Sequence, residues 1–296
     1  IVDIAGLVRG ASKGEGLGNQ FLANIRETDA IIHVIRCFDN DNIIHVDTTI
    51  DPIRDKETID FELQLKDLES LDKKLEKVRK TARTGNKDAQ KEQEVLEKLK
   101  KGLEAAVSVR AIELSEKERE EYVTPLQFIT DKPVLYVCNV DEKSAVNGND
   151  YVAKVKEAVK DENAEVIVLA VGTEADITEL DSFEERQLFL EDLGLQEAGS
   201  SVLIRAAYKL LNLQTYFTAG VKEVRAWTIN IGDTAPQAAG VIHSDFEKGF
   251  IRAEVIAYDD YVKFGSEAKV KEAGKMKVEG KEYIVKDGDV MHFRFN

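Results

Sequence analysis

The chain has 296 residues, of which 43% are hydrophobic and 33% charged, and its formal net charge is −15. This length allows two domains with buried cores, and no apolar run approaches the roughly 20 residues of a membrane span. The acidic balance argues against a protein that adheres to nucleic acid through an overall basic field. The charge is uneven, since residues 213–296 carry 12 Lys and Arg against 13 Asp and Glu, so any RNA contact is expected there or at local patches.

The first residues combine an apolar stub with a glycine-rich loop. Ile1 and Val2 lead through Asp3 to Gly6, five glycines lie between positions 6 and 18, and a helix-like segment follows from Asn19. In P-loop NTPases an Asp at such a strand end orients Mg²⁺, and the following Gly offers its N–H to the γ-phosphate. The pattern predicts a strand, a phosphate-sensing loop and a helix. A simple turn is the alternative, because strands often end in Asp and turns often contain Gly.

Residues 29–38 form a continuous apolar run, which predicts a strand buried on both faces of a parallel sheet. His33 within this run is interpreted as a core histidine. His45 lies in the polar segment that follows, where a surface residue and an active-site residue both remain possible. Cys37 and Cys138 lie in apolar runs, which indicates buried reduced thiols and a reducing compartment such as the cytoplasm.

Between residues 56 and 114 the apolar positions recur at steps of three and four, with a break at Thr84-Gly85-Asn86. This spacing predicts an antiparallel helical hairpin of coiled-coil type. Its charged faces are interpreted as solvated surface, and a partner-binding face is the alternative.

The sheet pattern returns at residues 133–138 and ends in Asn139-Val140-Asp141-Glu142. A helix is expected at 151–160 and a strand at 164–171, just before Gly172. In GTPases the corresponding strand ends in Asn-Lys-x-Asp, and its Asp binds guanine. Here Glu142 replaces the Asp, whereas Val140 replaces the Lys and is expected to pack on a purine face. The pattern predicts a nucleotide site with little guanine selection, or else an ordinary polar turn.

The last segment is rich in predicted strands, at residues 224–229, 251–258, 281–285 and 289–295, with a helix opening at 233–236. Mixed strands around one helix are typical of a β-grasp module. Its basic residues favour an edge for RNA phosphates and a mixed solvated surface about equally; they include Lys248, Arg252, Lys269 and Lys271.

Four strings together resemble the YchF/Obg-like ATPase family of P-loop GTPases: residues 3–19, 24–30, 211–218 and 245–253. The resemblance implies an α/β fold with an incomplete, doubly wound and mainly parallel sheet, an inserted helical hairpin and a C-terminal β-grasp (TGS) domain. It implies a first part of the G domain at 1–55, the helical insertion at 56–130, a second part of the G domain at 131–211 and the TGS domain at 212–296.

The resemblance also assigns roles to residues. Asp3 matches the position that holds Mg²⁺ through water, and Gly6 matches the γ-phosphate sensor. Leu7 stands where Ras-like proteins hold a water-orienting Gln, and a leucine cannot hydrogen-bond a water, so another group must position it. His45 matches the substitute suggested in this family. The altered base-reading set is matched by Asn139, Val140 and Glu142, with Gly172 in the loop before Glu174.

The function implied by the resemblance is a cytoplasmic, monomeric, ribosome-associated switch that hydrolyses ATP in preference to GTP with Mg²⁺. Its expected partners are the ribosome or a ribosomal subunit, and RNA through the TGS domain. The alternative is a ribosome- or RNA-binding module made of the helical arm and the TGS domain, in which nucleotide hydrolysis is incidental. No Gly-x-x-x-x-Gly-Lys-[Ser/Thr] occurs in the 296 residues, and the chain starts on Ile1. We therefore expect a truncated chain that binds nucleotide poorly.

Overall fold

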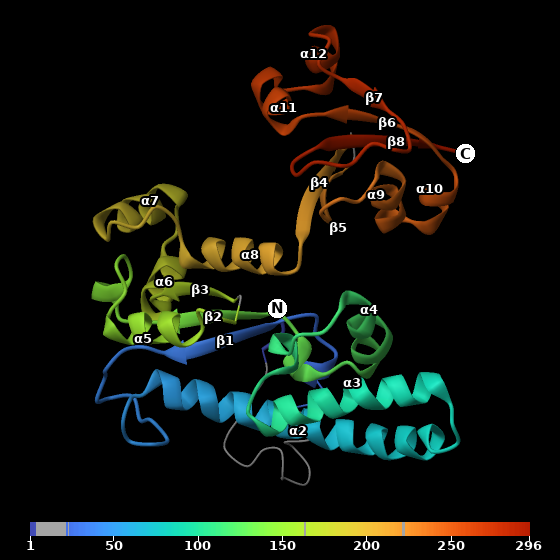
Figure 1. Cartoon of the computed structure of the whole chain (residues 1–296). Coiled ribbons are helices and arrows are strands. Elements are labelled where there is room, and N and C mark those ends of the chain that lie inside the picture. The colour runs from blue at the N-terminus through green and yellow to red at the C-terminus, as the bar shows by residue number, and fades with distance from the viewer. Residues whose placement is uncertain (4–21, 23, 163, 221–222) are drawn as a thin grey trace. The chain divides into compact units, whose positions relative to one another are not determined.

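The computed structural model describes residues 1–3, 22, 24–162, 164–220 and 223–296. The chain divides into two compact units, residues 1–207 and 208–296 (Figure 1). Within the described residues, no helix is both long enough and apolar enough to cross a membrane.

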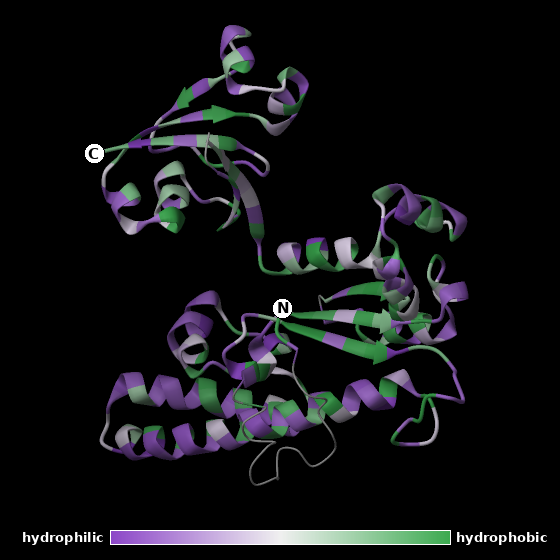
Figure 2. Ribbon diagram, turned by 180° about the vertical axis from the view of Figure 1, so that it is seen from behind, coloured by the Kyte–Doolittle hydropathy of each residue, from purple (hydrophilic) through white to green (hydrophobic). Residues whose placement is uncertain are grey.

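Unit 1 is built on a parallel sheet with the strand order β1-β2-β3. The strands are β1 (Ile31–Arg36), β2 (Val134–Asn139) and β3 (Glu165–Leu169), and Ile35 is in register with Cys138. The core on one face contains Ile35, Cys138 and, from helix α5 (Asp150–Ala158), Val155. The strands are mostly hydrophobic in Figure 2, as a sheet covered by helices requires.

Three helices follow β3 in sequence, which are α6 (Val171–Glu179), α7 (Phe183–Asp192) and α8 (Gly199–Leu210). Val34 lies on the face of β1 opposite Ile35 and is 58% exposed, and Ile1 and Val2 are exposed as well. The prediction of a strand buried on both faces is therefore wrong for β1 in the described part of the chain, where only β2 pairs with it. The expected apolar strand at Ile1–Asp3 also does not form, since these residues pair with no described strand.

The predicted helical hairpin is present. It consists of α2 (Pro52–Ala82) and α3 (Lys87–Glu104), joined by a short turn, and its seam is built from buried Leu71, Leu75 and Leu99. Asp51 caps the first helix and Asn86 the second. The short helical segments that return to the sheet are η2 (Val109–Ala111), α4 (Glu116–Glu118), η3 (Arg119–Val123), η4 (Thr124–Leu126), η5 (Ile129–Asp131) and, after β2, η6 (Glu142–Ser144).

Unit 2 is a mixed sheet with the order β5-β4-β8-β6-β7, consistent with the expected β-grasp fold. The strands are β4 (Leu213–Ala219), β5 (Val224–Asn230), β6 (Phe250–Ile256), β7 (Lys277–Glu279) and β8 (Val290–Phe295). The helices are α9 (Ala235–Ile242), α10 (Ser244–Lys248), α11 (Tyr258–Phe264) and α12 (Glu267–Glu272). The helix predicted to open at 233–236 is α9, and Thr234 is its N-cap residue.

Two details of this unit differ from the prediction. The strand expected at 281–285 is absent, apart from an isolated bridge between Ile284 and Thr234, and the edge strand is β7 instead. Helices α11 and α12 were not predicted at all. Helix α12 packs its buried Val270 against Ile256 and Val290 of the sheet, and α11 adds the partly buried Tyr261 and Phe264 to the same cluster.

Candidate nucleotide site

The predicted base-reading residues meet at one edge of the unit 1 sheet. The strands are parallel, so Asn139 at the end of β2 lies beside the loop after β3. The Asn139 side-chain oxygen accepts a hydrogen bond of 3.1 Å from the main-chain nitrogen of Val171. One side chain thus joins the two loops that doubly wound proteins use to hold ligands.

Val140 is only 3% exposed and belongs to the core cluster with Cys37 and Cys138. The expectation that its side chain packs on a purine face is therefore wrong for this structure. Its position follows from strand alternation, because residue 140 continues the buried face of Tyr136 and Cys138. Only the main chain at Val140 is left for a nucleotide contact.

Glu142 is exposed at the first position of η6. The neighbouring Asp141 instead points into its own turn, where its carboxylate accepts the N–H of Ser144 at 3.1 Å. Asp141 therefore caps this turn, whereas the carboxylate of Glu142 does not take part in the cap. That is the arrangement expected of a residue that reads a base.

Gly172, expected in a loop, is instead the second residue of helix α6. A Cβ added at Gly172 would meet no protein atom within 4 Å, so space is open above this turn. Glu174, one turn further on, accepts hydrogen bonds from the main-chain nitrogens of Gly199 and Ser200 at 2.6 and 3.0 Å. This contact ties α6 to the start of α8. Its two partners are 25 residues apart, so no local sequence pattern indicates it.

The phosphate side of the site is only partly described. Asp3 is exposed, as a carboxylate that contacts a hydrated cation needs to be. Gly6 and Leu7 lie outside the described residues.

His45 lies in the loop between β1 and α2 and is held by its neighbours. Its Nε2 is 2.9 Å from the Asp55 carboxylate, and its Nδ1 accepts the main-chain N–H of Asp47 at 3.1 Å. Ligand atoms of these three residues come within 4.8 Å of one another. Arg54 contacts both carboxylates, at 3.5 Å for Asp47 and 2.9 Å for Asp55, and offsets part of their charge, while both ring nitrogens of His45 already have partners. We therefore assign no metal to this cluster.

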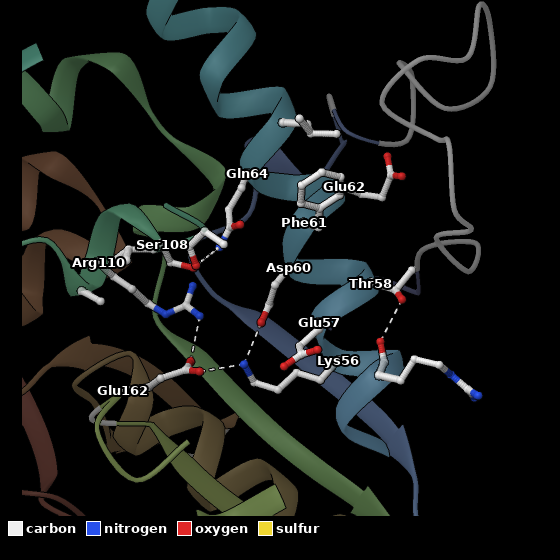
Figure 3. Close-up of a pocket in the computed structure, with 15 residues that line it drawn as sticks. Lys56, Glu57, Thr58, Asp60, Phe61, Glu62, Gln64, Ser108, Arg110 and Glu162 are labelled. Atoms are coloured by element: carbon white, nitrogen blue, oxygen red, sulfur yellow. Dashed lines mark hydrogen bonds and ion pairs between the residues drawn. The ribbon is translucent and has the colours of Figure 1, made fainter. Parts of the chain in front are cut away.

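A cavity of about 800 Å³ lies elsewhere in unit 1, between the first half of α2, η2 and Glu162, which precedes β3 (Figure 3). Lys56 is 2.7 Å from both Asp60 and Glu162, and Arg110 is 3.0 Å from Glu162. Burial raises the pKa of Glu162, but hydrogen bonds from Lys56 and Tyr136 outweigh it and the net pKa is lowered. Lys56 and Asp60 are an i,i+4 pair on α2, but Arg110 and Glu162 come from distant segments, so no sequence spacing indicates the whole network.

The basic residues predicted to contact RNA in unit 2 do not form one surface. Lys248 ends α10, whose Phe246 packs against the core on one face of the sheet. Lys269 and Lys271 lie on α12, which covers the opposite face through Val270. Arg252 is on β6, in register with Arg294. The basic edge expected from the sequence is therefore wrong, because strand alternation sends the two helices to different faces.

Comparison with known proteins gives a consistent result for both units. A family model described as "50S ribosome-binding GTPase" matches residues 1–82, and a model of the YchF GTPase C-terminal domain, described as a protein of unknown function, matches residues 213–296. The "Ribosome-binding ATPase YchF" of Haemophilus ducreyi is 57% identical over 295 residues, which cover 100% of this chain and 80% of that protein. The Bacillus subtilis protein of the same name is 55% identical over 296 residues, with 99% and 80% covered.

A solved structure, the YchF GTPase of Schizosaccharomyces pombe, matches with a TM-score of 0.82 and 39% identity. The match covers 98% of this chain and 78% of that one. It confirms the α/β, P-loop NTPase-like fold expected from the sequence.

Proposed function

The chain belongs to the YchF family of ribosome-binding ATPases, and from this membership we propose that it acts in a ribosome-associated nucleotide switch that prefers ATP to GTP. The observation that carries the proposal is the edge where Asn139 braces the loop at Val171 and leaves the Glu142 carboxylate exposed. The process served is translation or a stress response, in the cytoplasm, and the protein acts as a monomer.

The preference for ATP rests on Glu142. An Asp at this position accepts two hydrogen bonds from guanine, and a carboxylate one methylene longer does not occupy the same place. Open space above Gly172 leaves room for a base between the two loops. The contacts at Val140 and Gly172 are then made by the main chain.

The residues at the phosphate side also suit Mg²⁺ and a nucleotide. Asp3 would hold the ion through water, with Gly6 at the γ-phosphate and Leu7 beside it. Bound Mg²⁺ supplies charge neutralisation for the phosphates. Since Leu7 offers no hydrogen bond, His45 is the residue proposed to orient the attacking water, after it separates from Asp55.

The phosphate-binding loop has no counterpart in these 296 residues, so the printed chain should bind ATP weakly and hydrolyse it slowly. Tight ATP binding by the 296-residue chain alone in calorimetry would contradict this part of the proposal.

The domain assignment of the proposal follows the same logic. Residues 1–55 and 131–211 form the nucleotide-binding part, 56–130 the helical arm and 212–296 the TGS domain. The structural boundary between units, at residues 207 and 208, supports the last division.

The test is co-sedimentation of the protein with ribosomes in the presence of a non-hydrolysable ATP analogue, ADP or no nucleotide. The protein tested includes any segment encoded before Ile1. A switch requires different bound fractions in the three states. Equal fractions would favour a binding module in which hydrolysis is incidental. Glu142→Asp tests base selection, and we expect it to raise GTP affinity relative to ATP.

A further inference from the structure

In the described part of the chain, the unit 2 sheet ends in two edge strands of very different character (Figure 1). β7 has three residues and carries Lys277 and Glu279, and a short, charged strand of this kind resists pairing with another chain. β5 has seven residues in continuous register with β4, and it contains no Pro, no Lys and no bulge. A long edge without these protective features is a template for an added strand.

The phase of the β4–β5 ladder shows which main-chain groups of β5 face outward. Just beyond the strand, Ile231 donates its N–H to the carbonyl of Asn212 at 2.8 Å. Bonded and non-bonded pairs alternate in an antiparallel ladder, so the odd-numbered residues of β5 bond to β4 and the even-numbered ones point away from it. Asn230 agrees with this phase, because its N–H is donated to the Asp233 carboxylate at 2.9 Å and not to β4.

The outward groups of Val224, Ala226 and Thr228 are accessible. Val224 is 72% exposed, and the other two residues are exposed as well. The Thr228 hydroxyl lies 3.0 Å from that of Tyr208, which leaves the main-chain groups of Thr228 unused. The three N–H and three C=O groups form no hydrogen bond within the described residues. An added strand of about five residues would satisfy all of them.

Arg225 gives this edge a chemical preference. It is the only charged residue of β5, it is exposed, and it forms no ion pair within the described part of the chain. Its guanidinium carbon lies 4.0 Å from the centre of the Trp227 ring, and Trp227 is itself held by a hydrogen bond of 2.9 Å to the Thr218 hydroxyl. The stack keeps the cation along its own strand and not across the edge. An added strand therefore meets a positioned cation for which it can supply a carboxylate.

A second copy of the chain suits this edge less well. Two β5 strands paired with each other would both bring Arg225, and neither has an acidic residue between Val224 and Asn230. Like charges on neighbouring strands destabilise their pairing. The charge of the edge therefore favours a different protein segment that carries an acidic side chain.

We propose that β5 binds an extended segment of a partner protein by strand addition, with an Asp or Glu of that segment facing Arg225. Small or apolar side chains of the segment face Val224 and Ala226. This contact goes beyond the proposed function, since it uses none of the residues assigned to the nucleotide site.

The test measures binding of a labelled peptide to the full protein by fluorescence anisotropy. The peptide is Ser-Val-Leu-Thr-Asp-Val-Ser, whose Asp faces Arg225 when the peptide runs antiparallel to β5 with its Thr opposite Ala226. A second peptide has Lys in place of Asp and should bind at least tenfold more weakly. Arg225→Gln should lower the affinity for the Asp peptide about fivefold, whereas Lys281→Gln, an equal charge change at an exposed position of unit 2, should not.

A variant of the main chain separates strand addition from side-chain contact. Ala226→Pro removes an outward N–H that β4 does not use, and it should abolish peptide binding. Ala226→Val keeps this N–H and should bind like the unaltered protein. Circular dichroism checks that each variant folds.

Amide exchange followed by NMR gives a second readout, which needs no variant. Peptide binding should slow exchange at Val224, Ala226 and Thr228 and leave Arg225 and Trp227, already bonded to β4, unchanged. Peptide binding without this protection would overturn the proposal, since side chains alone would then make the contact. Equal affinity for the two peptides, or no binding at 1 mM Asp peptide, would overturn it too. A dimer in sedimentation that Ala226→Pro dissociates would assign the edge to a second copy instead.

Discussion

The side-chain oxygen of Asn139 lies 3.1 Å from the main-chain nitrogen of Val171 and accepts its hydrogen bond. The two residues are 32 positions apart, and this bond holds together the ends of neighbouring parallel strands. A nucleotide base between the two loops would therefore meet a surface that is already assembled. This relationship makes the site sensitive to Asn139 even if the side chain never touches the ligand.

Asn139→Ala should weaken nucleotide binding about tenfold, or about 1.4 kcal/mol, because the loop at Val171 loses its brace. The free energy of unfolding should fall by about 1 kcal/mol through the lost hydrogen bond. Calorimetric titration and denaturant unfolding measure the two effects. Asn147→Ala, at an exposed position nearby, serves as the control. Nucleotide affinity that Asn139→Ala leaves unchanged would rule out the bracing role.

Glu162→Gln should destabilise unit 1 by about 2 kcal/mol, since Arg110 then lacks its carboxylate partner whereas Lys56 keeps Asp60 at 2.7 Å. Glu157→Gln breaks an exposed pair with Lys160 and should cost less than about 1 kcal/mol. Urea unfolding of both variants gives the comparison. Similar losses in the two proteins would show that the network does not hold α2 against the sheet.

His45→Ala should lower the single-turnover rate of ATP hydrolysis by about a hundredfold, the range usual for a residue that assists proton transfer. Asp55→Asn should raise the rate, because it loosens the 2.9 Å contact that keeps His45 in the loop. Asp41→Asn, exposed in the same loop, is the matched control. A rate that is unaffected by His45→Ala would remove this residue from the site.

His33 should make unit 1 less stable in mild acid. Burial lowers its pKa below the ordinary 6.5, despite the opposing charge of Asp60. The unfolded chain therefore binds the proton more readily, and stability decreases as the pH falls below 6.5, by at most about 1.4 kcal/mol per pH unit. Urea unfolding between pH 7.5 and 5.5 measures this slope. His33→Gln should flatten it, whereas His292→Gln, exposed on β8, should not. An unchanged slope in the His33 variant would assign the effect to other groups.

Hydrophobic periodicity predicts most of the elements, because it reports burial directly. The hairpin seam at Leu71, Leu75 and Leu99 and the strand at 134–139 follow from spacing alone. The predictions from periodicity are wrong where the burial of a residue depends on a neighbouring strand or helix. Val34 reads as a core residue but is exposed, and the segment at 281–285 reads as a strand but pairs only through Ile284.

The sequence by itself determined the family, the helical hairpin and the main strands of both units, because motifs and periodicity are local properties. Only the tertiary structure decided that Val140 is buried, that Asn139 braces Val171 and that Glu162 joins Lys56 to Arg110. It also separated Lys248 from Lys271, which lie on helices that cover opposite faces of the unit 2 sheet. The reason is physical: which side chains share a surface depends on strand alternation and helix packing between distant segments, and no spacing along one segment contains that information.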